Sequence, residues 1–327
     1  MKKRLLTVLP VVLLAAGFSE MANALDVNLY GRVRLVLDYD NPDDGQTKLD
    51  VLNGSSRFGI KGSETLTDDL SAFYRAEFQY NAADGFNLND EKGNDFRLRL
   101  GYAGIKGNWG SLQIGQDWTP MYSLVTSKVD DPEFYFGFGF GQNKGSSFRQ
   151  NNMVKYNYTS TGYSNGNGFK FSGALIADGS DSGFTEFQPA IAYKAGPMYF
   201  GAVYRAQSLE GESDKDTLGL AFSWKPTSTS FIGMDYLDYS DAADSGNDEQ
   251  SFDITGTVKV GNGLFLTSVY GMTDNNAGTK DVDNIVIQLA RKFSKRTKIW
   301  VAATSSSDNV ENTDRSRFQV GIRRNFF

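Results

Sequence analysis

Apolar and polar residues alternate along most of the chain with a period of two. The alternation is clear over residues 27–39, 70–80 and 252–260, where one set of positions is mainly apolar and the other mostly polar. Over residues 96–102 the even positions are apolar, and two of the odd positions are arginines. Successive side chains of a strand point to opposite faces, so the pattern predicts strands with one apolar and one polar face.

About sixteen such segments follow one another at the spacing of a strand plus a turn, and no long helical period competes with them. Short turns, such as 195–196 and 261–263, alternate with long polar loops, such as 41–55 and 240–249. This arrangement is typical of outer-membrane barrels. The predicted strands start near Val27, Arg57, Leu70, Phe96, Gly110, Phe148, Phe169, Phe187, Met198, Thr217, Phe231, Phe252, Leu264, Asn284, Lys298 and Arg317.

A soluble β-sandwich would also alternate, but it would bury its apolar faces and place charge on its solvated faces. Here the apolar faces are rich in Phe, Tyr, Leu and Val and almost without charge, and aromatic residues gather near the segment ends. Both features favour a bilayer, where aromatic girdles mark the two interfaces. The predicted fold class is therefore all-β, a transmembrane antiparallel β-barrel of about sixteen strands.

The first 24 residues have the pattern of a secretory signal peptide. Lys2, Lys3 and Arg4 precede a short apolar stretch at 5–16, and Ala22-Asn23-Ala24 supplies the small residues of a cleavage site. Residues 1–24 are expected to be cleaved, and 25–327 to form the barrel domain in the outer membrane. The chain has no run of about 18 apolar residues, so no membrane-spanning helix is predicted.

The 327 residues include no cysteine and no histidine, and the formal net charge is −6. Without these side chains there are no His-based triads, no thiolate nucleophiles and none of the usual zinc sites. The acidic balance also argues against a nucleic-acid partner. Acidic groups such as Asp281 with Asp283 lack EF-hand spacing and are interpreted as solvated loops. The sequence predicts no enzyme, no cofactor and no metal site.

Several segments resemble the trimeric general porins of Gram-negative outer membranes: residues 29–32, 56–62, 102–115, 131–134 and 320–327. The resemblance runs loosely over the chain after residue 24. It implies a sixteen-stranded barrel with an inward-folded third loop, assembled as a homotrimer. It also implies passive diffusion of small hydrophilic solutes, contact with lipopolysaccharide and outer-membrane lipids, and insertion by the barrel assembly machinery. Gln116 departs from the family, which often has a basic residue there.

Strand parity places a set of arginines on the face away from lipid, where they avoid a cost of roughly 2–4 kcal/mol for a basic residue at mid-bilayer. The six arginines called the basic wall are Arg32, Arg57, Arg75, Arg97, Arg99 and Arg149. Strand parity places Arg34, Lys61 and Lys155 on the same face. The resemblance matches Arg32, Arg57 and Arg149 to basic positions of the family's pore constriction. Two alternatives remain open: the charges only solvate a wide lumen, or they pair across strands with Glu77 and Asp95.

The long segment 117–147 contains Asp130, Asp131 and Glu133, and its many aromatic residues argue against disorder. The resemblance implies that this third loop folds into the barrel, with its carboxylates facing the basic wall. Opposed charges across an aqueous slit create a transverse field, which orients polar solutes. The alternating Phe and Gly residues at 134–141 either pack the loop against the wall or extend a strand.

The predicted function is an outer-membrane channel for passive diffusion of small hydrophilic solutes and ions. Weak cation selectivity is expected because many acids lie in the long loops. The alternative is a substrate-specific porin, for example for oligosaccharides, with Tyr30, Phe73 and Trp118 as a stacking track. The last strand is expected to direct assembly through its lipid face and terminal aromatic residues, which are Phe318, Val320, Ile322, Phe326 and Phe327.

Overall fold

The computed structural model describes residues 25–43, 45–84, 96–130, 132–133, 148–177, 179, 183–208, 214–242, 247–275, 282–308 and 313–326. Most of these residues lie in β-strands. The short helices among them are α1 (Pro120–Leu124), η2 (Thr126–Lys128) and η3 (Thr161–Asn165). Within these ranges no helix combines the length and the hydropathy needed to cross a bilayer. The expected signal peptide and residues 134–141 lie outside the described part of the chain.

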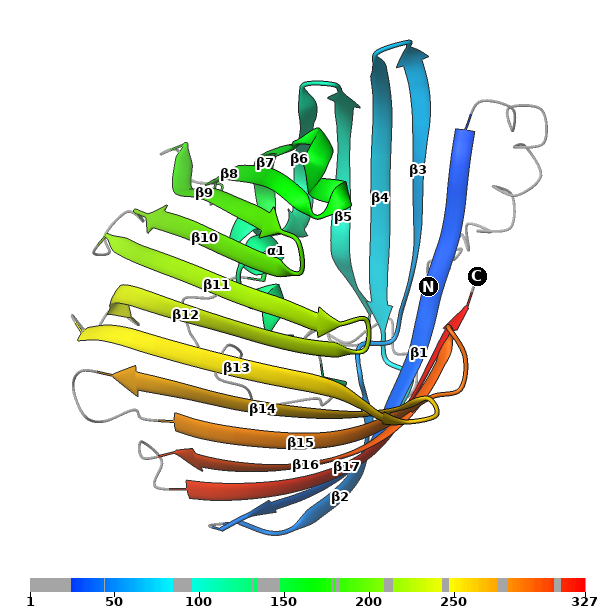
Figure 1. The fold of residues 1–327 in the computed structure, drawn as a ribbon, viewed down its shortest axis with the longest axis vertical. Helices are drawn as coiled ribbons and strands as arrows, with labels where there is room; N and C mark the ends of the chain where they lie inside the picture. The colour runs from blue at the N-terminus through cyan, green and yellow to red at the C-terminus, as the bar shows by residue number, and fades with distance from the viewer. Residues whose placement is uncertain are drawn as a thin grey trace, which may run out of the picture.

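The described strands form one antiparallel sheet that closes on itself (Figure 1). They are β1 (Leu25–Pro42), β2 (Lys48–Asn53), β3 (Arg57–Thr67), β4 (Leu70–Tyr80), β5 (Phe96–Gly107), β6 (Gly110–Trp118), β7 (Arg149–Thr159), β8 (Asn167–Ala177), β9 (Phe184–Ala195), β10 (Met198–Gln207), β11 (Lys215–Thr227), β12 (Ser230–Ala242), β13 (Asn247–Gly261), β14 (Leu264–Asn275), β15 (Val282–Lys292), β16 (Thr297–Asp308) and β17 (Thr313–Phe326). Strand β17 pairs with β1, from Gly31 opposite Phe326 to Pro42 opposite Arg315. This pairing removes the open sheet edge, whose backbone groups lipid cannot satisfy.

Strands β2 and β3 are two parts of one barrel strand. One half of β1 pairs with β2 over residues 35–40, and the other half pairs with β3 over residues 25–32. Between β2 and β3, Ser55 has a left-handed backbone with a φ of 68°. Counting β2 and β3 as one, the seventeen strands occupy sixteen positions around the barrel, which confirms the predicted number. Every predicted start lies inside a strand except Phe148, which immediately precedes β7.

The outer face of the barrel is apolar and the inner face is largely polar, as the alternation predicts. On β11, Leu218 and Leu220 are each 45% exposed on the outside. On the inner side, Gln288 of β15 and Gln319 of β17 are almost fully buried. An exposed apolar surface around a closed sheet suits contact with hydrocarbon chains.

The face pattern shifts by one position within β5. A β-bulge leaves Arg99 as an extra residue between Leu98 and Leu100, which pair with consecutive residues of β4. Leu100 is fully buried, and Tyr102 lines an inner cavity. The single apolar face predicted for residues 96–102 is therefore wrong beyond Leu98, because the bulge turns the rest of the strand over.

Candidate pore constriction

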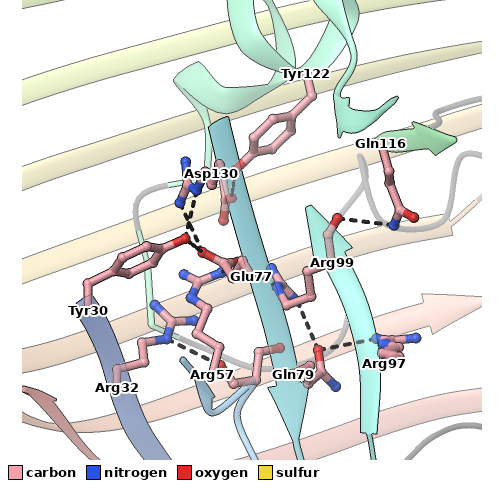
Figure 2. Close-up of polar contacts among 12 residues, drawn as sticks. Tyr30, Arg32, Arg57, Glu77, Gln79, Arg97, Arg99, Gln116, Tyr122 and Asp130 are labelled. Atoms are coloured by element: carbon pink, nitrogen blue, oxygen red, sulfur yellow. Dashed lines mark hydrogen bonds and ion pairs between the residues drawn. The ribbon is translucent and has the colours of Figure 1, made fainter. Parts of the chain in front are cut away.

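The six arginines of the basic wall project into the lumen from neighbouring strands on one side of the barrel. Arg32 lies on β1, Arg57 on β3, Arg75 on β4, Arg97 and Arg99 on β5, and Arg149 on β7. Figure 2 shows Arg32 and Arg57 close to Tyr30 and Glu77, Arg99 next to Glu77, and Arg97 next to Gln79. The structure thus brings together residues that are more than 100 positions apart in the sequence.

Glu77 lies at the centre of the basic wall and is almost fully buried. Its carboxylate oxygens lie 3.3 Å from Nη1 of Arg57, 2.9 Å from Nη2 of Arg75 and 3.0 Å from Nε of Arg99. The pairing with Glu77 that the sequence left open as an alternative is therefore present for these three arginines. A buried carboxylate with several guanidinium partners fixes the orientation of each of them.

Neutral polar groups hold two further arginines of the wall. Arg97 donates from Nη2 to Oε1 of Gln79 at 3.3 Å, and Arg32 donates from Nε to the Ser55 carbonyl oxygen at 3.3 Å. These acceptors fix the guanidinium groups without neutralising them. Because one carboxylate, Glu77, faces several arginines, the wall keeps a net positive charge.

A chain of aromatic contacts links the basic wall to the third loop. The Arg149 guanidinium carbon lies 4.7 Å from the centroid of the Trp118 ring, and this ring stacks on Tyr122 with centroids 4.2 Å apart. The Tyr122 hydroxyl donates to Oδ2 of Asp130 at 2.7 Å. Asp130 is exposed, and its partner Tyr122 lies close enough to Arg57 and Arg149 to interact with their charges. Asp130 thus presents a carboxylate to the lumen near the wall.

The first part of the third loop docks on the inner face of β9 to β12. Met121, Leu124 and Val125 of the loop are buried against apolar residues of these strands, and the Tyr199 hydroxyl donates to the Leu124 carbonyl oxygen at 2.6 Å. Figure 1 shows α1 on the inner side of the sheet. Burial of these apolar side chains therefore holds the loop on β9 to β12, on the side of the barrel opposite to the basic wall.

Two glycines make this docking possible. At Gly201 of β10 a side chain would collide with the Leu124 carbonyl oxygen, and at Gly233 of β12 it would collide with the Lys128 carbonyl oxygen. The backbone of the loop therefore lies directly on the backbone of the barrel.

Glu133 pairs with Arg34, which strand parity places on the lumen face, and with two cations that sequence reasoning did not single out, Lys298 and Arg323. Its carboxylate is buried and pairs with Lys298 at 3.0 Å, with Arg34 at 3.6 Å and with Arg323. Burial alone would raise the pKa of Glu133, but the three cations hold it below its usual range. Glu133 thus anchors the loop to β1, β16 and β17 through ion pairs, and it also lies close enough to Arg32 of the basic wall to interact with its charge. Asp131 lies outside the described residues.

Sequence reasoning did not single out Lys298 and Arg323 as site residues. Strand parity contained the signal, because Lys298 precedes the outward Ile299 and Arg323 follows the outward Ile322. Strand parity gives the face of Lys298 but not its partner, Glu133, which lies 165 positions earlier in the chain. The departure at Gln116 also has a structural role, since its side chain donates to the carbonyl oxygens of Leu98 and Arg99 at 3.1 Å beside the bulge.

The closing strand presents the predicted lipid face. Phe318, Val320 and Ile322 are exposed on the outside of β17. Phe326 pairs with Gly31 of β1, and its ring covers the space that a side chain at Gly31 would need. Phe327 lies outside the described residues.

A closed antiparallel barrel with an apolar outer face, a charged lumen and a loop docked inside it defines the class of transmembrane β-barrels of the outer membrane. The family model described as Gram-negative porin matches residues 10–312 of the chain. The chain therefore belongs to the Gram-negative porin family.

Relatives and solved structures agree with this assignment. The chain is 31% identical over 198 residues to an outer membrane porin protein of Bordetella pertussis, covering 53% of this chain and 49% of that protein. It is 26% identical over 162 residues to the chitoporin of Vibrio furnissii, covering 48% of this chain and 42% of that protein. Both matches thus span less than half of each relative. The anion-selective porin from Comamonas acidovorans has the same fold, with a TM-score of 0.77 at 19% identity over 92% of this chain and all of that one.

Proposed function

We propose that the protein is a channel for passive diffusion of small hydrophilic solutes and ions across the outer membrane, narrowed where the third loop faces the basic wall. One observation carries this proposal. The Tyr122–Asp130 pair of the loop and the arginines around Glu77 present opposite charges to the lumen. Such a field favours polar solutes that can align with it.

The proposed assembly is a homotrimer delivered by a signal peptide at residues 1–24. The sequence pattern of the N-terminus supports export. One of the similar solved structures, OmpT of Vibrio cholerae, is described as a trimer form. Contacts with lipopolysaccharide, outer-membrane lipids and the barrel assembly machinery follow from the same family membership and belong to this proposal.

We further propose a selectivity that depends on ionic strength, with a weak preference for cations at low salt. The acids of the long loops act at a distance, and their effect weakens as the screening length falls from about 30 Å at 0.01 M to about 10 Å at 0.1 M. The basic wall is closer to a permeating ion and is screened less. Because Glu133 is neutralised by three cations, the loop offsets this wall only through its other carboxylates.

A substrate-specific channel for oligosaccharides is the second candidate. The similarity to a chitoporin and the aromatic rings of Tyr30, Phe73 and Trp118 favour it. Against it, Tyr30 and Trp118 are engaged: the Tyr30 hydroxyl accepts from Nε of Arg75 at 2.7 Å, and the Trp118 ring stacks on Tyr122. Titrating oligosaccharides into single channels separates the candidates, because saturable block at micromolar concentrations would favour the specific channel.

The decisive experiment is planar-bilayer recording of the purified protein. A trimeric diffusion channel should give ohmic conductance in steps grouped in threes. Single steps of one size would contradict the trimer, and an absence of conductance from correctly folded protein would overturn the proposed function.

A further inference from the structure

The five short connections that join β7 to β8, β9 to β10, β11 to β12, β13 to β14 and β15 to β16 carry a strongly one-sided charge. Residues 159–171, 192–202, 222–234, 256–268 and 289–301 surround these turns and contain no Asp or Glu. They do contain the basic residues Lys170, Lys194, Lys225, Lys259, Arg291, Lys292, Lys295, Arg296 and Lys298. The acids of the same strands lie toward the long loops, so the turn end of β7 to β16 is locally positive although the whole chain is acidic.

Part of this basic group lines a cavity on the inner face of the barrel. The cavity has a volume of about 660 Å³ and lies between the third loop and the turn ends of β9 to β16. Lys128 of the loop, Lys194 of β9 and Lys225 of β11 contribute to its lining, together with Tyr163 and Tyr199. Among the described residues that line it there is no carboxylate. The volume is within the range typical of small-molecule sites.

These lysines differ from the arginines of the constriction in their partners. Within the described ranges, no carboxylate lies within ion-pair distance of Lys128, Lys194 or Lys225. Instead, Nζ of Lys128 lies 4.5 Å from the Tyr199 ring centroid and Nζ of Lys194 lies 4.1 Å from that of Tyr163. An aromatic face attracts a cation but leaves its charge uncompensated.

The lysines also repel one another. Burial, followed by the charges of Lys170, Lys194 and Lys225, lowers the pKa of Lys128 to about 8. A bound anion with several negative charges would reduce the repulsion between these lysines and so favour their protonated forms. Lysine suits such a role because its ammonium group is a compact charge on a flexible stem that adapts to anions of different shape.

We propose that this cavity, the lysine cavity, binds a small anion carrying several charges, of the polyphosphate or polycarboxylate kind. The inference goes beyond the proposed diffusion function and does not depend on it, because binding can be measured on a protein that conducts nothing. The site is separate from the basic wall, which lies on β1 to β7.

The test is calorimetric titration of the detergent-solubilised protein with tripolyphosphate or citrate, at constant ionic strength. The variant is K194Q with K225Q, and the matched control is K61Q with K106Q, which removes the same charge from a separate inner cavity. We expect one anion per chain and at least about tenfold weaker binding in the variant, since each lost lysine removes a charge-assisted contact. The control should stay within about twofold of the parent.

The two anions distinguish the ligand chemistry, since tighter tripolyphosphate binding would indicate phosphate and tighter citrate binding carboxylate. Heat-modifiable electrophoretic mobility confirms that each variant is folded. An unchanged affinity in K194Q with K225Q, equal losses in variant and control, or no saturable binding by the parent would each overturn the proposal. A protein that binds the anion but does not conduct would contradict the proposed function and leave this inference standing.

Discussion

Gly233 of β12 and Lys128 of the third loop are in direct backbone contact, so that the Lys128 carbonyl oxygen occupies the space where a side chain at position 233 would begin. The loop can therefore lie inside the barrel in this conformation only because position 233 has no side chain. The same relation holds between Gly201 and Leu124.

Replacing Gly233 by Ala should push the loop away from the wall, because the colliding atom belongs to the backbone and cannot rotate aside. We expect a loss of about 1–3 kcal/mol in stability, as for other overpacked positions, and a changed single-channel conductance. Gly256→Ala is the matched control, since the nearest atom to a side chain there is Ser268 Oγ at 3.9 Å. Equal conductance in G233A and the parent would contradict the docking role.

Replacing Glu133 by Gln should release the far end of the loop, because Lys298, Arg34 and Arg323 would lose their common carboxylate. Removing one partner of a buried ion pair costs about 3–5 kcal/mol. The expected readout is a lower temperature of heat-modifiable unfolding and noisier open-channel current. Glu64→Gln, at an exposed position of β3, should change neither.

The anchor should also weaken in acid. The pKa of Glu133 is depressed in the folded protein, so its stabilising contribution is present above the unfolded value of about 4.3 and is lost as the pH falls through the folded value. Current noise of the parent should therefore rise at low pH toward that of E133Q. If E133Q shows the same rise, another group controls the loop.

Ion selectivity should respond in opposite directions to changes on the two sides of the lumen. R32Q with R57Q should move the reversal potential toward cations, and D130N with D131N should move it toward anions, because each removes one sign of fixed charge. The parent should prefer cations weakly at 0.01 M salt and lose that preference as salt rises. Identical reversal potentials in the parent and both variants would show that these residues do not flank the permeation path.

Anion binding in the lysine cavity should weaken as the pH rises through about 8. Below this value Lys128 is protonated and contributes its charge, and above it the charge is lost. The other groups facing Lys128 are Lys170, Lys194, Lys225 and Tyr199, so a residual dependence at higher pH is expected from the remaining lysines. In K128Q the affinity for citrate, whose charge changes little between pH 7 and 9, should be lower and should fall less over this range than in the parent. A parent affinity for citrate that does not change between pH 7 and 9 would contradict the assignment to Lys128.

Deletion of Phe326 and Phe327 should lower insertion into the outer membrane and raise degradation in the periplasm. The deletion removes the residue that pairs with Gly31 and shortens the contact that closes the sheet. Phe169→Leu, at another outward phenylalanine, serves as the control. Normal yields of heat-modifiable barrel from the deletion would reject the predicted role of the last strand.

Alternation alone was sufficient to predict the strands and most of their faces, because lipid and lumen impose a strict period of two on each crossing. It failed beyond Leu98, where the bulge at Arg99 breaks the period without an obvious sequence signal. The break between β2 and β3 was also missed, since residues 48–53 were assigned to a loop.

The basic wall was predictable for the same reason as the strands, since strand parity gives the face of each arginine. The partners of these charges were not predictable. Glu77 and its arginines lie on the same strand or on adjacent strands, so their pairing could be considered as an alternative from the sequence. Glu133 of the third loop contacts Lys298 of β16 inside the barrel. Neither the alternation of polar and apolar residues nor the sequence spacing predicts this contact, because it forms only when the barrel closes.

The contact of Glu133 with Lys298 and Arg323 has a consequence for the order of folding. The first anchor of the loop is the apolar docking surface on β9 to β12. These strands follow the loop closely in the sequence, so they are synthesised soon after it. Two of the three cations of the second anchor of the loop, Lys298 and Arg323, belong to β16 and β17, the last strands to be made, and the third, Arg34, belongs to β1, the first. Before β16 and β17 form, Glu133 therefore has only Arg34 as an ion-pair partner, and the last two strands complete the anchor when they close the barrel. The narrow part of the channel is therefore completed late in folding, together with the closure of the β-barrel.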